Sequence, residues 1–319
     1  MSRGTTGFVC LLVLNFGAAG GWAQVSIQQR IAPSARRDSP PNLRVNTSLV
    51  LVPVSVTDAW NRPVLGLEKG RFRIFDNSVE QQVANLALED APVAIAVVFD
   101  MSGSMRPKLR KSRIALARLL ETANPEDEFC LIEFSDGVRL AKNWTSETSE
   151  ITGALADAVP GGRTALLDAI ALGLREVKKS TKPRKAVVIL SDGGDNRSRL
   201  TERELRSMAR ESDALIYAMG IFEGMGIQLS LEELAGPGLL EEITEASGGR
   251  LFPVSDVNHL PGIAARIGVE LHNQYVLAYS PRAMQHDGRH HRVRVQVLPP
   301  AGISTVKVDW RTGYRAPIQ

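Results

Sequence analysis

The chain has 319 residues, of which 44% are hydrophobic and 23% are charged, and its formal net charge is +3. This apolar content can build a substantial core, which excludes wholesale disorder and a polytopic membrane protein. A charge so close to zero leaves no electrostatic footprint for nucleic acid, and the length favours about two domains.

The first 23 residues have the pattern of a secretory signal peptide. Arg3 supplies a positive charge, an apolar run follows from Phe8 to Ala19, and Gly21-Trp22-Ala23 places small residues around a cleavage point. We therefore expect export to the periplasm or the cell surface, with no transmembrane segment in the mature chain. An uncleaved anchor is the alternative, although this apolar run is shorter than the roughly 20 residues that a spanning helix needs.

The next segment, residues 24–42, predicts a flexible linker because it is rich in Pro, Ser and Arg and lacks hydrophobic periodicity.

The two cysteines of the chain lie in different predicted segments. Cys10 would leave with the signal peptide. Cys130 lies in the apolar run from Phe129 to Ile132, which predicts a buried strand residue without a disulfide partner.

Residues 43–90 predict a small β unit. Val50, Val52, Val54 and Val56 alternate with a period of two, as in a strand with one face turned inward. Further strands are expected at Phe72–Phe75 and Val83–Leu88, with turn residues between them.

Residues 91–273 have the alternating pattern of an α/β domain. The uninterrupted apolar run Val93–Phe99 is typical of a parallel strand that is buried on both faces. Strands and helices then alternate, which indicates βαβ units on a doubly wound, mostly parallel sheet, with an antiparallel edge strand near Gly137–Leu140. The expected strands are Phe129–Phe134, Ala186–Leu190 and Ala214–Gly220, and the expected helices are Leu109–Thr122, Ala165–Lys179, Thr201–Glu211, Leu231–Ala246 and Val257–Asn273.

The tail, residues 274–319, contains the strand patterns Tyr275–Tyr279 and Val293–Val297, which predict a hairpin. A hairpin is marginal alone, so we expect it to pack on the amino-terminal β unit. The two chain ends would then build one small β-sandwich beside the α/β domain.

Three loops at the predicted strand ends and helix starts carry oxygen ligands. Asp100, Ser102 and Ser104 follow the first parallel strand, Thr164 precedes a helix, and Asp192 follows the strand Ala186–Leu190. Ligands bind at the carboxyl ends of strands in open parallel sheets. Without thiolate or imidazole, the set favours a hard divalent ion, Mg²⁺ first and then Mn²⁺ or Ca²⁺. Two carboxylates and three hydroxyls leave such an ion able to accept a carboxylate from another protein.

These motifs resemble the von Willebrand factor A domain family, whose metal-ion-dependent adhesion site has the pattern D-x-S-x-S, then Thr, then Asp. The resemblance covers about residues 91–270 and implies a metal site at Asp100, Ser102, Ser104, Thr164 and Asp192. The flanking segments, such as QYVLAYSP, resemble an exported, acidobacterial-type subgroup, from which Gly70 departs because an Asp is expected there. The implied function is a non-enzymatic, metal-dependent adhesion or scaffold module that captures an acidic residue of a partner.

Two other functions use the same residues. In one, the strand-end Asp cluster belongs to a metal-dependent hydrolase of phosphoesters, although no acid/base partner is evident. In the other, the ion only rigidifies the loops and the β unit carries the interaction surface.

Several polar residues near the motifs have more ordinary interpretations. The first motif alone could cap a helix. We expect Asp195 to be a turn residue or to support a ligand indirectly, and we expect His286, His290 and His291 to be solvated. Five cationic residues after the first motif form either a solvated helix face or a patch that steers acidic partners. They are Arg106, Lys108, Arg110, Lys111 and Arg113.

Overall fold

A six-stranded sheet forms the centre of the computed structural model, which describes residues 49–156, 158–222, 231–281 and 288–316. Five strands are parallel and the edge strand β7 is antiparallel. In spatial order they are β10 (Arg250–Val254), β9 (Leu215–Ile221), β8 (Arg184–Ser191), β5 (Val93–Asp100), β6 (Glu128–Phe134) and β7 (Val138–Thr145). All eight residues of β5 are buried, as its unbroken apolar run predicts.

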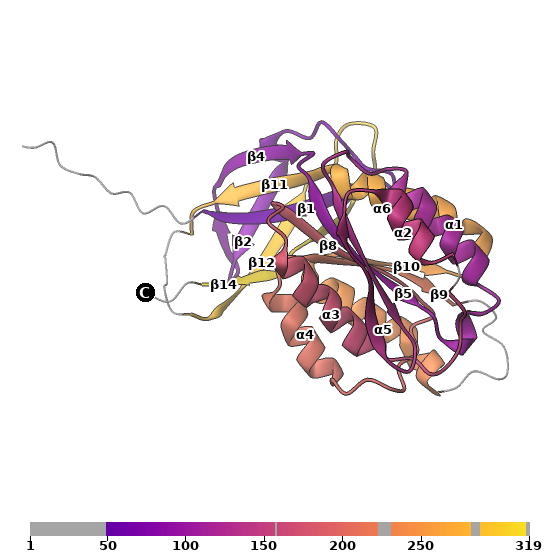
Figure 1. Ribbon diagram of the computed structural model, residues 1–319. Coiled ribbons are helices and arrows are strands. Elements are labelled where there is room, and N and C mark those ends of the chain that lie inside the picture. The colour runs from indigo at the N-terminus through magenta and orange to yellow at the C-terminus, as the bar shows by residue number, and fades with distance from the viewer. Residues whose placement is uncertain (1–48, 157, 223–230, 282–287, 317–319) are drawn as a thin grey trace, which may run out of the picture. The chain divides into compact units, whose positions relative to one another are not determined.

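Helices cover both faces of this sheet (Figure 1). On one face lie α1 (Leu109–Leu120), α2 (Thr148–Ala154) and α6 (Leu260–His272). On the other lie α3 (Leu166–Lys179), α4 (Glu202–Glu211) and α5 (Leu231–Ser247). Among the described residues there are also three short 3-10 turns, at Lys69–Arg71, Gly103–Met105 and Val257–His259.

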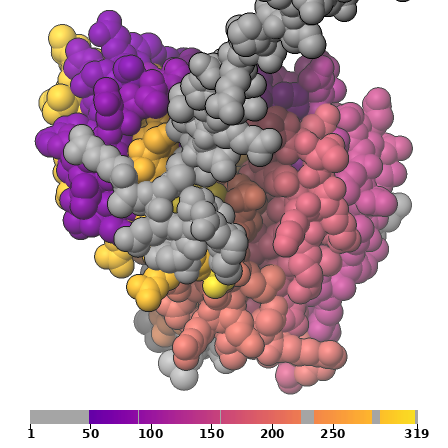
Figure 2. Space-filling model, turned by 90° about the vertical axis from the view of Figure 1, so that its left-hand side faces the viewer, coloured from indigo at the N-terminus to yellow at the C-terminus, as the bar shows by residue number. Residues whose placement is uncertain are grey.

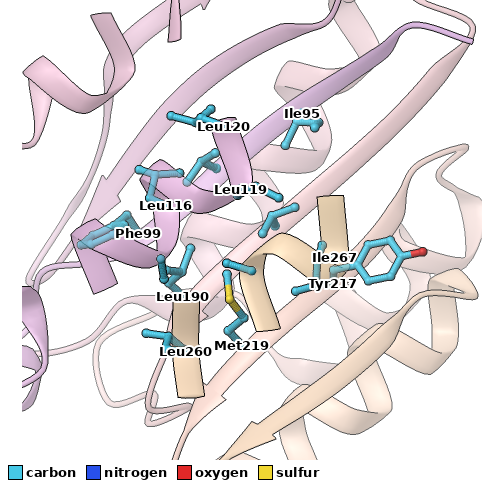
Figure 3. Packing of buried hydrophobic residues seen from close by; sticks show 14 of the residues in the cluster. Ile95, Phe99, Leu116, Leu119, Leu120, Leu190, Tyr217, Met219, Leu260 and Ile267 are labelled. Carbon is cyan, nitrogen blue, oxygen red and sulfur yellow. The ribbon is translucent and has the colours of Figure 1, made fainter. Parts of the chain in front are cut away.

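Two hydrophobic layers hold the helices to the sheet. Strand β5 contributes to both, because Val97 and Phe99 face the α1 and α6 layer while Val98 faces the α3 layer. Figure 3 shows the first layer, where Leu116 of α1 and Ile267 of α6 lie over the strands.

The flanking strands form two antiparallel four-stranded sheets around a third hydrophobic core. One sheet has the order β13 (Lys307–Trp310), β1 (Val50–Thr57), β11 (Gln274–Tyr279) and β4 (Val83–Glu89). The other has the order β14 (Gly313–Arg315), β12 (His290–Val297), β2 (Phe72–Asp76) and β3 (Val79–Gln81). The indigo amino-terminal and yellow carboxyl-terminal strands share one side of the molecule (Figure 2). The predicted fold class is therefore confirmed, including a sandwich built from both ends of the described chain.

The expected hairpin in the tail is wrong. Strand β11 lies between β1 and β4, whereas β12 lies between β14 and β2 in the other sheet. A hairpin would have placed the apolar faces of both strands in one sheet and left the opposite sheet without its central strand. Because β11 and β12 lie in different sheets, Leu277 of β11 and Val295 of β12 contribute to the same core from opposite sides.

The expectation that the tail histidines are solvated holds for His290, which is exposed, while His286 lies outside the described residues. It is wrong for His291, which is 5% exposed. Alternation along β12 turns His291 inward with Val293 and Val295. Its Nδ1 lies 3.1 Å from Oδ1 of the buried Asp76.

A buried polar network joins the central sheet to the sandwich. The Arg250 guanidinium of β10 lies 2.5 Å from Glu270 of α6 and 3.3 Å from Asp309 of β13. The Tyr217 hydroxyl donates to Glu270 over 3.2 Å and accepts from Gln274 Nε2 over 2.8 Å. The side chains of Arg250 and Glu270 are each 4% exposed, so this ion pair is isolated from water.

The remaining sequence predictions have mixed outcomes. Cys130 is buried in β6 without a disulfide, and burial raises the pKa of its thiol, so it is a poor nucleophile. The signal peptide and the linker, residues 1–42, lie outside the described residues. The boundaries at 90/91 and 273/274 stay predictions, since residues 47–319 form one compact unit. Within the described ranges, no helix has both the length and the apolar character to cross a bilayer.

Candidate metal centre

Four of the five candidate ligands, Asp100, Ser102, Ser104 and Asp192, lie at the carboxyl ends of β5 and β8, which are neighbouring parallel strands. Phe99 of β5 lies opposite Leu190 of β8, and each strand ends at the following residue, Asp100 or Ser191. After β5 the chain continues to α1 on one face, and after β8 it continues to α4 on the other face. The two connections thus diverge at these strand ends, which is the position of the ligand crevice in a doubly wound sheet.

The first loop brings a carboxylate and two hydroxyls together. Asp100 is fully buried, and its Oδ1 accepts the backbone N–H of Ser102 over 2.8 Å, which tightens the turn. The hydroxyl oxygens of Ser102 and Ser104 lie 3.1 Å apart. Spacing by two residues therefore places both hydroxyls on one side of the loop.

The third loop adds a second buried carboxylate, Asp192, which is 6% exposed. Its Oδ2 lies 3.1 Å from the Lys108 ammonium, and the two side chains are 7% and 12% exposed. Lys108 immediately precedes α1, so the helix that follows the first loop brings a positive charge to the third loop. The sequence indicated a cationic cluster here but gave no sign of this pair.

A glycine contact determines the path of the third loop. Gly193 has φ +84°, and a Cβ built there would lie 3.0 Å from the backbone of Gly236 in α5. Only glycine adopts this conformation without strain while the two backbones are this close. The contact therefore holds the residue next to Asp192 against α5.

The second loop reaches the other two through backbone hydrogen bonds. Gly103 N–H donates to the carbonyl of Gly162 over 3.1 Å. The Thr164 carbonyl accepts from Asn196 N–H, and the Thr164 N–H donates to Asn196 Oδ1, both over 3.0 Å. Thr164 is 6% exposed. Among the described residues, its hydrogen bonds lead to the Asn196 loop and not to the other four candidate side chains.

Ser191 is a site residue that the sequence interpretation missed. Its hydroxyl donates to Asp100 Oδ2 over 2.6 Å and accepts the N–H of Gly193 over 3.0 Å. It thereby orients the first carboxylate and the third loop together. Its position beside Asp192 in the SDGGD segment was visible, but the contact with Asp100 depends on the β5–β8 register.

Asp195 behaves as predicted, as a turn residue. Its Oδ1 accepts from Leu167 N–H in the first turn of α3 over 3.3 Å and from the Ser198 hydroxyl over 2.6 Å. It therefore supports the start of α3 and the loop before α4.

The cationic cluster is partly engaged with the protein itself. Besides Lys108, Arg106 donates to the Pro160 carbonyl over 3.4 Å and Arg113 donates to that of Ala158 over 2.7 Å. These bonds attach the loop before Thr164 to α1.

The electrostatics of the crevice favour a cation. Burial, and then the nearby carboxylate of Asp192, raise the pKa of Asp100 to about 7. Two adjacent buried carboxylates with hydroxyls beside them fit a hard divalent ion, which takes oxygen donors. Across the described ranges no group of three or more His, Cys, Asp and Glu side chains is arranged to hold a metal. The candidate site has only two carboxylates, so its remaining metal ligands would be hydroxyls.

These loops can be compared with known proteins. Residues 95–194 match the model of the von Willebrand factor type A domain. This match to the type A domain spans about a third of the chain and includes all five candidate ligands. No curated protein sequence matches the chain.

Solved structures with the same fold include von Willebrand factor type A from Catenulispora acidiphila, at 13% identity and a TM-score of 0.51, covering 86% of this chain and 75% of that one. Protein BatB from Bacteroides thetaiotaomicron is 18% identical with a TM-score of 0.44, covering 56% and 98%. Proximal thread matrix protein 1 from the mussel byssus, described with a zinc-occupied MIDAS motif, is 20% identical with a TM-score of 0.48, covering 61% and 49%. The likeness to the first of these structures, at 13% identity, is one of fold alone.

Proposed function

We propose that the chain is a non-enzymatic protein-binding module, exported for adhesion or scaffolding, that captures an acidic residue of a partner through a divalent cation. Asp100, Ser102, Ser104, Thr164 and Asp192 would hold the cation, with Mg²⁺ the first candidate and Mn²⁺ or Ca²⁺ the alternatives. When bound, the ion would supply a coordination position for the partner's carboxylate.

The single observation that carries this proposal is the meeting of two buried carboxylates and two contacting hydroxyls at the carboxyl ends of β5 and β8. The proximity of Asp192 contributes to the raised pKa of Asp100, so this crevice stabilises added positive charge. The match to the type A domain supports the same set, because the matched residues contain every candidate ligand.

Three further observations support the proposal. Ser191 would hold the Asp100 carboxylate in one orientation through the 2.6 Å hydrogen bond. The three loops contain no histidine, so they offer no imidazole as a general acid or base. The flanking segments agree with an exported subgroup of these domains, and the predicted leader is consistent with a periplasmic or cell-surface location.

Calorimetry of the purified chain with MgCl₂ tests the metal site. We expect one Mg²⁺ per chain and a loss of affinity of at least about tenfold in Asp192→Asn. Asp195→Asn is the matched control, because Asp195 lies in the same loop but bonds to Leu167 and Ser198. Absence of Mg²⁺, Mn²⁺ and Ca²⁺ uptake by the unsubstituted chain would overturn the proposal.

Partner capture requires a separate test. The chain is immobilised and exposed to the host's envelope fraction with Mg²⁺ or with EDTA, beside Asp192→Asn under both conditions. We expect capture of a protein only by the unsubstituted chain with Mg²⁺. Capture that persists equally in EDTA and in Asp192→Asn contradicts a metal-mediated contact.

A further inference from the structure

A groove of about 880 Å³ lies next to the candidate metal centre on the α3 face of the central sheet. Its walls are the turn between β6 and β7, the first turns of α3, and the loop before α4. Ala165, which follows Thr164 directly, lines it. Arg197, another lining residue, donates its backbone N–H to the Thr164 carbonyl over 3.1 Å. A single hydrogen bond therefore links a residue that lines the groove to Thr164, a proposed ligand.

Three exposed arginines, Arg175, Arg197 and Arg199, line this groove. Within the described part of the chain, none of their side chains has an acidic partner. An arginine fork matches a carboxylate with two parallel hydrogen bonds, so three such groups in one groove suit an acidic ligand.

The two aspartates that line the groove are bonded to its walls. Asp168 accepts from the backbone N–H groups of Arg199 and Leu200, each over 3.1 Å. Asp136 accepts from the N–H of Arg163 over 3.0 Å. These carboxylates brace the loops and do not pair with the arginine side chains.

A second cavity beside the first loop has its charges paired. It is smaller, about 160 Å³, and is lined by Met101 and the buried Glu133. The carboxylate oxygen Oε2 of Glu133 pairs with Arg139, which also lines this cavity. The arginine of this cavity is therefore already neutralised, whereas those of the groove are not neutralised by any described residue, so an acidic segment bound at the crevice would extend toward the groove.

We infer that the groove receives a run of acidic residues of the partner protein, adjacent to the carboxylate captured at the proposed cation. The inference rests on the proposed function, which supplies that first carboxylate. In an extended segment, side chains two residues apart lie on the same side at about 7 Å spacing. Successive glutamates can then reach the crevice and the arginines, while Val138 and Leu172 contact their apolar stems.

Fluorescence anisotropy tests the groove with two labelled probes of equal length, a hexaglutamate peptide and a Gly-Ser peptide with one glutamate. Each is titrated with the full chain in Mg²⁺ and in EDTA. We expect hexaglutamate to bind more tightly, and Arg197→Glu/Arg199→Glu to weaken it about tenfold without changing the single-glutamate probe. Both substituted side chains are exposed, and the backbone N–H groups that donate to Thr164 and Asp168 remain. Thermal melts and Mg²⁺ calorimetry verify that the variant is intact.

The matched control is Arg110→Glu, because Arg110 is exposed on α1, over the opposite face of the sheet. At physiological salt the Debye length is about 8 Å, so we expect less than a twofold effect there. Equal weakening by the control, or equal binding of both probes, overturns the groove inference. If Mg²⁺ changes nothing but hexaglutamate binding still depends on Arg197 and Arg199, the groove binds acidic segments by itself, and the proposed function fails together with the adjacency to a captured carboxylate. If EDTA weakens hexaglutamate binding but Arg197→Glu/Arg199→Glu binds the peptide like the unsubstituted chain, the proposed function stands and the groove inference fails.

Discussion

The ammonium of Lys108 lies 3.1 Å from Oδ2 of Asp192, and both side chains are almost completely buried. A lysine from the start of α1 thus supplies positive charge to one of the five proposed ligands. A divalent cation in the crevice would compete with this ammonium for Asp192 and be repelled by it.

Replacing Lys108 by Met is therefore expected to strengthen Mg²⁺ binding by about tenfold, since the competing charge is lost while the apolar stem is kept. Calorimetry measures the affinity directly. Lys111→Met removes the same charge one helical turn further along α1 and is expected to leave affinity unchanged. Weaker Mg²⁺ binding in Lys108→Met would mean that the ammonium positions Asp192 for the metal.

The buried Asp100 predicts a pH-dependent stability when divalent ions are chelated. Its pKa is raised to about 7, above the ordinary value of 3.8, so the folded chain binds a proton that the unfolded chain releases between these values. The free energy of unfolding from this group falls as pH rises through that window, by at most about 4 kcal/mol. Urea unfolding in EDTA from about pH 4 to 8 measures this slope. Asp100→Asn removes the proton exchange, and an unchanged slope in that variant would assign the dependence to other groups.

Gly193→Ala is expected to lower stability by about 1–2 kcal/mol and to weaken Mg²⁺ binding. Alanine at φ +84° is strained, and its Cβ would press on the backbone of Gly236 and displace the loop that holds Asp192. Gly161→Ala is the control, because a Cβ there has no atom within 4 Å. Denaturation and calorimetry on both variants check this, and equal effects would show that the third loop does not depend on the glycine contact.

Glu270→Gln is expected to destabilise the chain by about 3 kcal/mol, because it leaves the buried Arg250 guanidinium without its closest countercharge. The exposed pair Arg118–Glu121 offers a control, since its side chains are 56% and 58% exposed. Glu121→Gln should change stability by less than about 1 kcal/mol. Chemical denaturation of both variants measures the difference, and a small effect in Glu270→Gln would indicate that water reaches the network.

Much of the fold followed from hydrophobic patterns. The run Val93–Phe99 is typical of a strand buried on both faces and was predicted as one, and the 3.6-residue periodicity predicted α1, α3 and α4 to within two residues at each end. The short elements α2 and β10 were missed because neither has a long pattern of its own: one has a single fully buried residue, Ile151, and the other contains Pro253.

The candidate ligands were accessible from the sequence because their chemistry lies at strand ends, where parallel topology brings side chains together. The roles of Ser191 and Lys108 were not accessible, since one depends on the β5–β8 register and the other on where α1 starts. Pairing across the sandwich was misjudged for a related reason. Strands that are neighbours in sequence usually pair, yet β12, which contains His291 and Val293, pairs with β2 and β14.

Strand β1 has both of its partners, β11 and β13, more than 200 residues further along the chain. During synthesis at roughly 5–20 residues per second, its edges would wait on the order of ten seconds or longer for those partners. The α/β part, by contrast, is complete once β10 and α6 have emerged. The sandwich is therefore the last part to assemble, and exposed β1 edges are the place where a newly made chain would aggregate or need a chaperone.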